Sequence, residues 1–415
     1  MRKLGGAVIP MQTSSNPDVL NKVNFLVGSA EIAVELPDIP SMIPFNDTVI
    51  DFLNEVSKSL MKNPESRPYS DVITFGFWIR RASTIKLKER FEQTNGNSHL
   101  GRGVAFHIAP SNVPVNFAYS LVSGLLCGNA NVVRVPTKDF PQVSLIIEAI
   151  NQALDSFEAM RPYIFLVRYE RDKEVNDFFS SVADVRIVWG GDNTIAELRR
   201  SPLPPRSTEI TFADRYSLAV IDSDKYLAIE DKNRVAQDFY NDTFFSDQNA
   251  CTSPRIIIWT GSQIEKAKHV FWKNEHELVK SKYQFQAIQG VNKLTSSYLV
   301  SVAIPGCKIE PHDDNLIIRV KVPHLNNSLM DYKDNSGFFF EYDCTDIMEL
   351  QKLCNNKRCQ TLSYIGDSEQ FMELIESGIK GIDRIVPVGK TMDFDMIWDG
   401  YNLYSLLTRI IGVVR

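Results

Sequence analysis

The chain has 415 residues, a formal net charge of −6 at pH 7, and 44% hydrophobic and 23% charged residues. A chain of this length is too long for one ordinary hydrophobic core, so we expect two domains. The acidic balance excludes a typical nucleic-acid-binding protein, whose surface would be basic, while local clusters of lysine and arginine can still bind anionic small molecules.

The first 100 residues predict a mostly helical segment, with helices over 48–61 and 70–82 and no chemical motif. Residues 1–14 have a basic start but no apolar core of signal-peptide length. The longest apolar run, Phe117 to Cys127, is too short to cross a bilayer. The cysteines are widely scattered, at 127, 251, 307, 344, 354 and 359. We therefore expect a cytoplasmic protein without a membrane span, in which the thiols are reduced.

Residues 104–221 alternate apolar strands with helices. Strands are predicted over 104–108, 131–135, 164–167, 185–189 and 218–221, and helices over 113–127, 141–154 and 192–198. Pro114 suits a first helical turn, and Gly128 suits a helix end. This alternation is typical of a parallel sheet covered on both faces, which binds ligands beyond the carboxyl ends of its strands.

A second domain is predicted after Cys251. It contains a buried strand over 254–259, a charged amphipathic helix over 264–281, and later strands that alternate with a helix over 346–355. Phe338, Phe339 and Phe340 are candidates for lining an apolar tunnel, but successive strand residues face opposite sides, so at least one belongs to a core.

One cysteine, Cys251, lies among small and polar residues in the segment Asp247–Pro254. A cysteine that only fills a core normally has apolar neighbours. One that attacks carbonyls needs space for a substrate and backbone N–H groups for the developing oxyanion. Taken alone, Cys251 is equally consistent with buried packing and with catalysis.

Two other places are candidates for binding a phosphate-bearing ligand. The turn Gly190–Gly191 follows a predicted strand and precedes a helix, whose N-terminus can bind phosphate; an ordinary tight turn is equally consistent with the sequence. Arg134 ends a strand and is followed by Thr137 and Lys138, so it can face an adenosine ribose or its 2′-phosphate. A lone arginine at such a place is more often a solvated surface charge.

The histidines predict neither a general base nor a metal centre. His107 lies inside an apolar strand and is expected to be a core histidine. His269 and His276 lie on the charged helix, and the six histidines show no metal-ligand spacing, so we predict no metal site.

Three stretches of the chain resemble the LuxC-like fatty acyl-CoA reductases, a branch of the aldehyde dehydrogenase superfamily. They are residues 128–136, residues 247–254, and Arg384–Gly389 followed by Trp398–Tyr401. In addition, Asn112–Val113–Pro114 stands where the superfamily carries its Asn-aromatic-Pro motif. The resemblance extends from about residue 100 to the end of the sequence.

The resemblance implies an α/β fold of the aldehyde dehydrogenase type, with two doubly wound parallel-sheet (Rossmann-like) domains and the active site between them. Residues 1–100 would pack on a dinucleotide-binding domain over 101–236, followed by a catalytic domain over 237–395 and a C-terminal segment over 396–415. The implied partners are an acyl-CoA or acyl-protein substrate, an acyl-protein synthetase and further copies of the chain in a homo-oligomer. The pathway would be bioluminescence or the synthesis of a lipid or surface polysaccharide.

The implied reaction is reduction of a long-chain fatty acyl thioester to the aldehyde. Cys251 would attack the thioester carbonyl, and the Asn112 side chain and the Cys251 N–H would hold the oxyanion. A reduced nicotinamide would then deliver hydride to the acyl-cysteine. The cofactor would be bound by residues at the strand ends, namely Arg134, Thr137, Lys138, Gly190 and Gly191. We expect NADPH, although NADH would serve the same chemistry.

One departure from the superfamily concerns the base that activates water in aldehyde-oxidising members. Their Glu-Leu-Gly-Gly-Lys element corresponds here to residues 209–215, which lack the glycine pair, and Glu209 does not fall in a clean register. An enzyme that reduces its thioester has no use for an activated water, so the departure favours reduction over aldehyde oxidation. Reduction of an acyl phosphate is a rival hypothesis, as is a non-catalytic cofactor-binding subunit in which Cys251 only packs.

Overall fold

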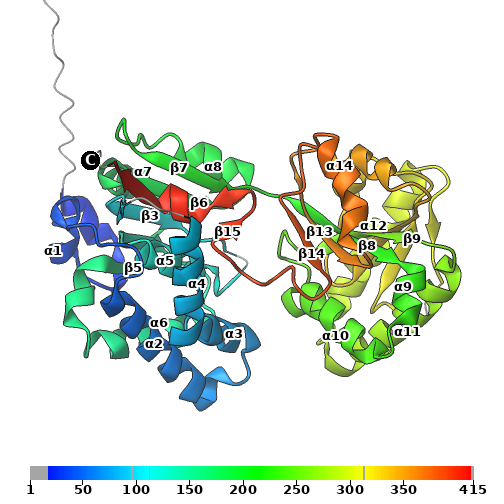
Figure 1. Ribbon diagram of the computed structural model, residues 1–415, viewed down its shortest axis with the longest axis horizontal. Helices are drawn as coiled ribbons and strands as arrows, with labels where there is room; N and C mark the ends of the chain where they lie inside the picture. Colours follow the sequence, from blue (N-terminus) through cyan, green and yellow to red (C-terminus); the bar gives the residue numbers. More distant parts are fainter. Residues whose placement is uncertain (1–16, 95–97, 112, 312–313, 413–415) are drawn as a thin grey trace, which may run out of the picture. The chain divides into compact units, whose positions relative to one another are not determined.

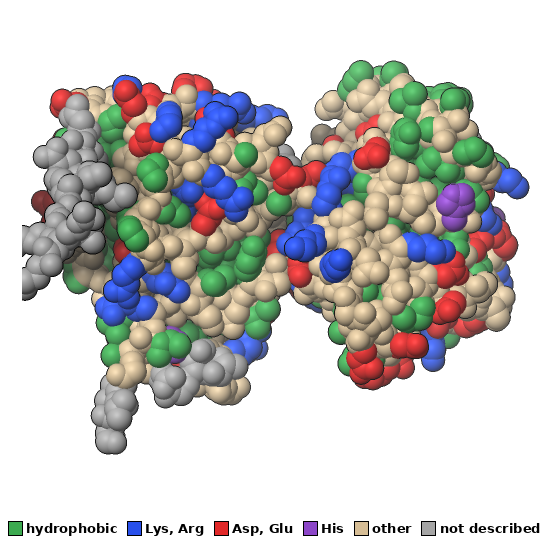
Figure 2. Space-filling view, turned by 90° about the horizontal axis from the view of Figure 1, so that it is seen from above, with side chains coloured by type: hydrophobic (Ala, Val, Ile, Leu, Met, Phe, Trp, Pro, Cys, Tyr) green, Lys and Arg blue, Asp and Glu red, His purple; other side chains and the backbone are tan. Residues whose placement is uncertain are grey.

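The computed structural model describes residues 17–94, 98–111, 113–311 and 314–412. The chain forms two compact units (Figure 1). The first unit comprises the chain up to Ala213 together with the segment from Asn402, and the second unit is Asp214–Tyr401. On the face that Figure 2 shows, acidic and basic side chains are interspersed on both units. Within the described residues, no helix is long and apolar enough to cross a membrane.

The first unit is built on a six-stranded sheet with the order β1-β5-β4-β3-β6-β7, in which only β1 runs antiparallel to its neighbour. The strands are β1 (Asn24–Val27), β3 (Val104–Ile108), β4 (Ala130–Arg134), β5 (Ile164–Arg168), β6 (Val185–Trp189) and β7 (Thr208–Phe212). The helices that connect the parallel strands are α5 (Asn116–Leu126), α6 (Pro141–Leu154), α7 (Lys173–Val182) and α8 (Asp192–Leu198). The predicted parallel sheet is thus confirmed.

Helix α2 (Asp47–Lys62) joins the N-terminal helices to this sheet, because it contacts α5 and α6. The side chain of Asn46 accepts from the Thr48 N–H and caps the helix. Its apolar residues recur at helical spacing and are buried. The other elements before β3 are η1 (Pro17–Lys22), α1 (Ala30–Ala33), η2 (Leu36–Asp38), η3 (Pro64–Ser66), α3 (Ser70–Trp78), α4 (Arg81–Thr94) and β2 (Ser98–Gly101).

The end of the chain returns to the first unit. Strand β17 (Thr408–Ile411) pairs antiparallel with β2, and Tyr404, on α15 (Leu403–Leu407), packs against the rings of Phe45 and Phe91. Burial of these aromatic side chains ties the two distant segments together.

The second unit contains a seven-stranded sheet with the order β10-β11-β12-β9-β8-β13-β14, parallel except for β10. The strands are β8 (Tyr216–Asp222), β9 (Pro254–Thr260), β10 (Lys308–Ile309), β11 (Ile318–Lys321), β12 (Phe338–Asp343), β13 (Cys359–Ile365) and β14 (Arg384–Pro387). The helices include α9 (Ser223–Ala228), α10 (Lys232–Asp242), α11 (Ile264–Lys282), α12 (Ala287–Ala303), α13 (Gln351–Cys354) and α14 (Met372–Glu376). Smaller elements are η4 (Glu158–Tyr163) in the first unit and η5 (Phe244–Ser246), η6 (Asn327–Tyr332), η7 (Ile347–Leu350) and η8 (Ser368–Phe371) in the second.

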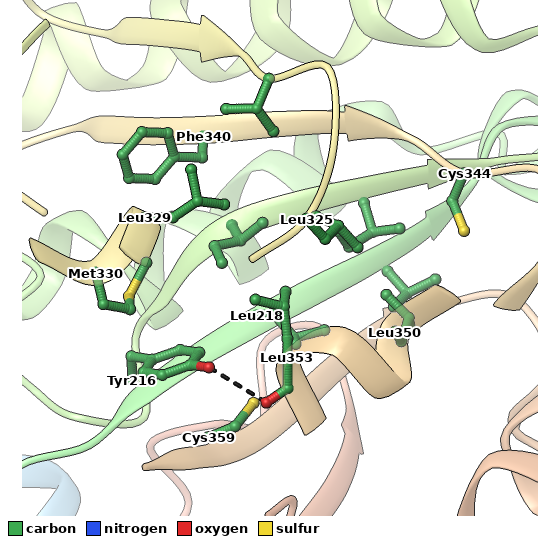
Figure 3. Close-up of a cluster of buried hydrophobic side chains, with 14 of the residues drawn as sticks. Tyr216, Leu218, Leu325, Leu329, Met330, Phe340, Cys344, Leu350, Leu353 and Cys359 are labelled. Carbon is green, nitrogen blue, oxygen red and sulfur yellow. Dashed lines mark hydrogen bonds between the residues drawn. The ribbon is translucent and has the colours of Figure 1, made fainter. Parts of the chain in front are cut away.

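Both faces of the second sheet are buried, and alternate residues of each strand enter opposite cores. Leu218 and Phe340 belong to the core drawn in Figure 3, where the Tyr216 hydroxyl donates to the Leu353 carbonyl at 3.3 Å. Ala219 and Phe339 belong to the opposite core, which α10 and α11 cover.

Two sequence-based expectations are corrected here. The strand predicted over 218–221 does not close the first sheet but lies in the second, and β7 is the last strand of the first sheet. A buried apolar strand has the same composition in either sheet, so its sequence does not reveal its neighbours. Phe338, Phe339 and Phe340 are all at most 1% exposed and are core residues rather than the lining of a tunnel. The predicted functional division after residue 236 stays a prediction, whereas the compact units divide after Ala213.

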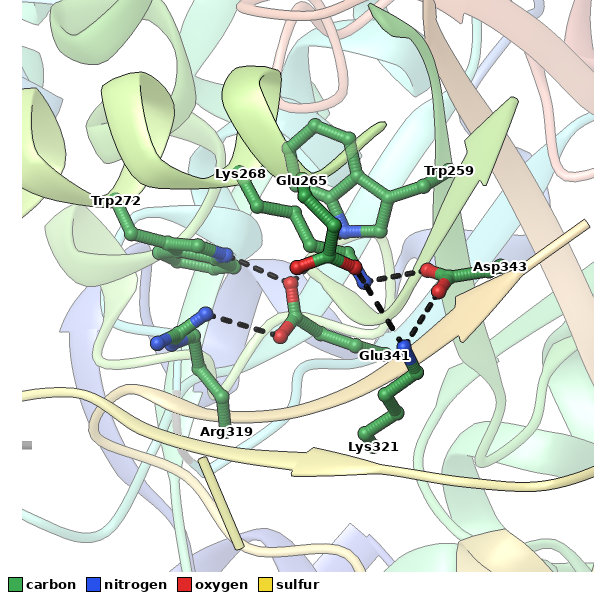
Figure 4. A network of polar contacts seen from close by, with 8 residues as sticks. All are labelled: Trp259, Glu265, Lys268, Trp272, Arg319, Lys321, Glu341 and Asp343. Atoms are coloured by element: carbon green, nitrogen blue, oxygen red, sulfur yellow. Dashed lines mark hydrogen bonds and ion pairs between the residues drawn. The ribbon is translucent and has the colours of Figure 1, made fainter. Parts of the chain in front are cut away.

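A network of buried and partly buried polar groups lies at one end of this sheet (Figure 4). The Glu341 carboxylate accepts from the indole N–H groups of Trp259 and Trp272 at 2.8 and 2.7 Å and from Arg319 at 3.1 Å. Beside it, Asp343 pairs with Lys268 and with Lys321. Every cation in this network therefore has a carboxylate partner, as buried charges require.

Glu275 on α11 contrasts with this network. Its side chain is fully buried, and neither carboxyl oxygen has a hydrogen-bond partner among the described residues. Burial raises the pKa of Glu275 well above its ordinary value, so we infer that the carboxyl group is protonated near neutral pH.

Replacing Glu275 by glutamine should flatten the pH dependence of stability. Because the pKa of Glu275 is raised by folding, the stability that its bound proton contributes is lost as the pH rises from the unfolded pKa towards the folded pKa. Relative to Glu275→Gln, the native protein should lose up to about 1.4 kcal/mol of unfolding free energy per pH unit within that window. Urea denaturation between about pH 5 and pH 8 tests this. Glu277→Gln, at an exposed position of the same helix, should leave the slope unchanged, and equal slopes for all three proteins would contradict the assignment.

Candidate active site

The predicted cofactor-binding residues gather at one edge of the first sheet. Arg134 ends β4, and Gly190 follows β6, while β3 lies between these two strands. Because the three strands are parallel, their carboxyl ends meet at the same edge. Thr137, Lys138 and Gly191 follow the same strand ends. Asn112, which the sequence places just beyond β3, lies outside the described residues.

The glycine turn leaves open space in front of the backbone. Gly191 is the N-cap residue of α8, and a Cβ atom built on it would meet nothing within 4 Å. A Cβ atom on Gly190 would press on Thr194 Cγ2 at 3.1 Å. A ligand phosphate can therefore approach the backbone at Gly191 closely, as binding at a helix N-terminus requires, and the residues present fit a dinucleotide.

Arg134 and Lys138, the two basic residues at this edge, differ in whether neighbouring residues already hold their charged groups. The Arg134 guanidinium donates to the Tyr169 carbonyl at 3.1 Å and lies 4.5 Å over the Tyr169 ring. Lys138 and Thr137 are exposed, and the Lys138 ammonium lies 4.9 Å from the centre of the Phe140 ring. Lys138 is thus the more accessible cation for a ligand phosphate.

His107 is a core histidine, as the sequence predicted. It is fully buried, its Nδ1 lies 2.7 Å from Ser120 Oγ, and its Nε2 lies 3.1 Å from Asn131 Oδ1. Burial lowers the pKa of His107 to about 4, so the ring is neutral at physiological pH.

The Glu209 carboxylate is paired with two arginines. It lies on β7, where Arg186 donates to its Oε2 at 2.5 Å and Arg199 donates to its Oε1 at 2.7 Å. Burial acts to raise the pKa of Glu209, but the hydrogen bonds of Arg199 and Arg186 outweigh it and hold the pKa below its usual range. A carboxylate that activates water needs one oxygen free to accept the proton, and both oxygens of Glu209 are paired with arginines, so the geometry opposes that role.

Cys251 lies in the loop before β9, at the amino edge of the second sheet. The Ser217 hydroxyl donates to the Cys251 carbonyl at 2.7 Å, and the Thr252 hydroxyl lies 3.3 Å from Met392 Sδ. Cys251 is partly buried; Cys307 shares this intermediate exposure, while the remaining cysteines are fully buried. Of the aromatic residues before it, Phe239, Tyr240 and Phe244 are core residues, and Phe245 is 40% exposed.

Gln248 fixes the loop that carries Cys251. Its fully buried side chain accepts from the backbone N–H groups of Gly337 and Phe338 at 2.7 and 3.2 Å, and its amide donates to the Pro254 carbonyl at 3.3 Å. Asp247 and Gln248 both have positive φ, at 53° and 51°, a strained backbone that surrounding contacts must hold. At Gly337, φ is 90° and a Cβ atom would meet the Leu316 carbonyl at 2.5 Å, so only glycine fits against this loop.

Several charges act on the Cys251 thiol. Burial raises its pKa, as do the charges of Asp214 and Asp399, whereas the backbone N–H of Arg215 and the charge of Lys333 lower it. Asp214 is itself paired with Lys333 at 3.2 Å and with Arg358 at 3.3 Å, which reduces its effect on the thiol.

The Trp398–Tyr401 segment, which carries part of the sequence resemblance, forms a tight hairpin between β15 (Ile397–Trp398) and β16 (Tyr401–Asn402). Asp399 and Gly400 take positive φ at its two central positions, 50° and 77°, as a primed turn requires. Gln360 donates to the buried Asp399 carboxyl, and burial raises the pKa of Asp399 to about 6. This part of the resemblance therefore forms a turn that packs beside strand β13.

The residues that hold the Cys251 loop could not be assigned from the sequence. Arg255 follows Pro254 directly in the chain, but its acceptors, the Gln248 and Asp334 carbonyls, are revealed only by the fold.

Among the described residues, no group of three or more histidine, cysteine, aspartate and glutamate side chains could hold a metal ion.

Gln248→Leu should destabilise the second unit. The leucine leaves the Gly337 and Phe338 N–H groups buried without their acceptor, which costs about 3 kcal/mol in unfolding free energy. Gln263→Leu is the matched control, because the exposed Gln263 amide makes one hydrogen bond to Asp224, and its loss should cost less than about 0.5 kcal/mol. Urea denaturation measures both, and losses of similar size would contradict the role of Gln248.

Comparisons with known proteins found relatives in sequence and in structure. Residues 85–274, which include the Cys251 segment, match the family model of the acyl-CoA reductases (LuxC). The long-chain acyl-protein thioester reductase of Aliivibrio fischeri is 23% identical over 322 residues, which are 76% of this chain and 64% of the relative. That of Vibrio harveyi is 23% identical over 299 residues, 69% of this chain and 59% of the relative. The match thus covers less than two thirds of the length of these relatives.

Solved structures with the same fold are aldehyde dehydrogenases. A salicylaldehyde dehydrogenase from Pseudomonas putida G7 has a TM-score of 0.65 at 12% identity, with 92% of this chain and 88% of that chain covered. The glyceraldehyde-3-phosphate dehydrogenase GapN of Methanocaldococcus jannaschii, solved with NADP, has a TM-score of 0.63 at 13% identity, with 92% of each chain covered. The protein therefore has the aldehyde dehydrogenase fold, and the resemblance of its sequence to the LuxC acyl-CoA reductases is confirmed.

Proposed function

We propose that this protein reduces a long-chain fatty acyl thioester, carried by CoA or by a protein, to the aldehyde, with Cys251 as the nucleophile. The observation that carries the proposal is the position of Cys251, a partly buried thiol on a loop that Gln248 holds in a strained conformation. The relatives that match over this region are named long-chain acyl-protein thioester reductases, which supports the choice of substrate.

In the proposed reaction, the Cys251 thiolate attacks the thioester carbonyl carbon, and the carbon–sulfur bond to the donor breaks, so that the donor leaves as a thiol after taking up a proton. The Asn112 side-chain amide and the Cys251 backbone N–H are the proposed donors to the oxyanion. A reduced nicotinamide, when bound, would supply a hydride to the acyl carbon, and the carbon–sulfur bond to Cys251 would then break, which releases the aldehyde and restores the Cys251 thiolate. The ion pairs of Glu209 disfavour the rival reaction, aldehyde oxidation, which needs a free base to activate water.

We propose that the nicotinamide cofactor is held at the carboxyl edge of the first sheet by Thr137, Lys138, Gly190 and Gly191, with Arg134 beside them. The open backbone at Gly191 and the exposed ammonium of Lys138 support this assignment. We propose NADPH rather than NADH, because a cation at this edge can pair with the 2′-phosphate.

A protein partner is also part of the proposal. The exposed face of α12 is uncharged and carries large apolar side chains, namely Ile288, Val291, Tyr298, Leu299 and Val302. Such a face is typical of a protein–protein contact, which supports a homo-oligomer or docking of an acyl-protein or its synthetase. A cytoplasmic location completes the proposal.

Palmitoyl-CoA should add one acyl group to the native protein, and the adduct should disappear on addition of NADPH as the aldehyde forms. Intact-mass measurement follows both steps. Cys251→Ala should acquire no acyl group, while Cys307→Ala, which removes the other partly buried thiol, should behave as the native protein. Absence of an adduct on every protein would exclude the acyl-CoA reaction, and acylation by an acyl phosphate instead would favour that rival substrate.

Lys138→Met should weaken the use of NADPH selectively. Loss of one charge-assisted contact to the 2′-phosphate, worth about 1.5 kcal/mol, should raise the KM for NADPH about tenfold. The KM for NADH should change by less than about twofold, because NADH has no phosphate there. Lys173→Met, at an exposed position on α7, is the control and should change neither value. Equal increases for both cofactors would contradict the assignment of Lys138.

A further inference from the structure

Residues 388–393 follow β14, which is the edge strand of the second sheet, and fold back beside it. Arg384, the first residue of β14, donates to three backbone carbonyls of this 388–393 segment. The acceptors are the carbonyls of Thr391, Asp393 and Lys390, at 3.1, 3.2 and 3.4 Å. Because the end of the segment thus lies beside the beginning of the strand, the chain returns towards the amino edge of the sheet, where Cys251 lies.

A buried carboxylate holds the other side of the 388–393 segment. Asp242, the last residue of α10, is fully buried, and its two oxygens accept from the backbone N–H groups of Gly389 at 2.7 Å and Thr391 at 3.1 Å. Gly389 has a φ of 91°, and a Cβ atom built on it would meet Asp238 Cβ at 2.6 Å, so the segment lies directly against α10. A guanidinium therefore binds the acceptors of the segment and a carboxylate binds its donors, which fixes its path.

The segment is tied to the chain on both sides of Cys251. Asp242 precedes the loop that carries the cysteine, and Thr252 follows the cysteine directly. The Thr252 hydroxyl lies 3.3 Å from Met392 Sδ, and Thr252 is only 5% exposed, so this contact forms inside the unit. Met392 thus brings the 388–393 segment to within one residue of the candidate nucleophile.

Met392 has the properties of a residue that meets an apolar substrate group. It is partly buried, and its unbranched thioether side chain can adapt to irregular apolar surfaces. In the proposed acyl-enzyme, the bond to sulfur fixes the carbonyl carbon and the first carbons of the chain beside Cys251. A side chain in contact with the next residue, Thr252, therefore lies nearer to these first carbons than to the far end of a long chain.

We propose that Met392 is a specificity-determining residue that packs beside the first carbons of the acyl group and selects chains that are unbranched at carbon 2. This inference rests on the proposed function, because it concerns an acyl group on Cys251. Asp242 and Arg384 are positioning residues, since they hold the backbone of the segment that carries Met392.

The test compares palmitoyl-CoA with 2-methylpalmitoyl-CoA, which differ by one methyl group next to the carbonyl carbon. The native protein should prefer palmitoyl-CoA in kcat/KM, and Met392→Ala should reduce that preference about tenfold, because a pocket discriminates a single methyl group by about this factor. The preference for palmitoyl-CoA over octanoyl-CoA, which differ at the far end of the chain, should stay within about twofold. An undiminished preference for the unbranched chain in Met392→Ala would overturn the proposal.

Three further variants separate specificity from folding. Met392→Leu conserves the volume of the side chain and should retain the native preference. Met348→Ala removes a partly buried methionine that packs against the core drawn in Figure 3, and it should change neither preference. Asp242→Asn replaces one of the two acceptor oxygens by an NH₂ donor and should weaken the preference for the unbranched chain less than Met392→Ala does. A full native preference in Asp242→Asn would exclude the positioning role of Asp242.

The position of Met392 can also be tested without an acyl substrate. Peptide mass spectrometry follows alkylation of Cys251 by iodoacetamide and by the larger N-phenylmaleimide. Met392→Ala should raise the rate with the larger reagent relative to the smaller one, while Met348→Ala should leave this ratio unchanged. A raised ratio without acylation by palmitoyl-CoA would exclude the acyl-CoA reaction but retain the placement of Met392. Acylation of Cys251 with an unchanged ratio and an unchanged preference in Met392→Ala would retain the reductase and exclude the role of Met392.

Discussion

The side-chain amide of Gln248 is the constraint on which the geometry around Cys251 depends. It joins a loop with two successive residues of positive φ to the first N–H groups of β12. A buried amide that is satisfied on both its donor and acceptor atoms specifies one arrangement of the two segments. The glycine at 337 completes the constraint, because any side chain there would displace the carbonyl of Leu316. The loop that carries Cys251 is thus held by polar contacts to the start of β12.

Much of the secondary structure could be predicted from sequence because strands buried on both faces leave a clear signal. The helix over Pro141–Leu154 and the strand over Val185–Trp189 lie where the apolar pattern indicates. Membership of a sheet could not be predicted in the same way. Leu218 pairs with Ile256 and Leu362 of its neighbours, and nothing in its own segment distinguishes these partners from those of the first sheet. The boundary between the units could therefore be located only from the structure.

The candidate cysteine was recognisable from sequence, whereas the residues that hold its loop were not. Cys251 is conspicuous because its neighbours are small and polar. The contacts around its loop include the hydrogen bond from Arg255 to the Asp334 carbonyl, 79 residues away, and they depend on the order of strands β12, β9 and β8. For Glu209, the sequence left a role as a general base open. Only the structure shows that Arg186 and Arg199 pair with its carboxylate.

The pairing of β2 with β17 has a consequence for the order in which the protein can assemble during synthesis. His99 and Thr408, whose side chains meet in this ladder, are 309 residues apart, and the whole of the second unit, Asp214–Tyr401, lies between them. The second unit is one uninterrupted stretch that can fold as soon as it leaves the ribosome. The first unit must wait with the edge of β2 uncovered until β17 emerges. An unpaired strand edge invites association with other chains, so the newly made first unit is the part of this protein that most needs protection from aggregation.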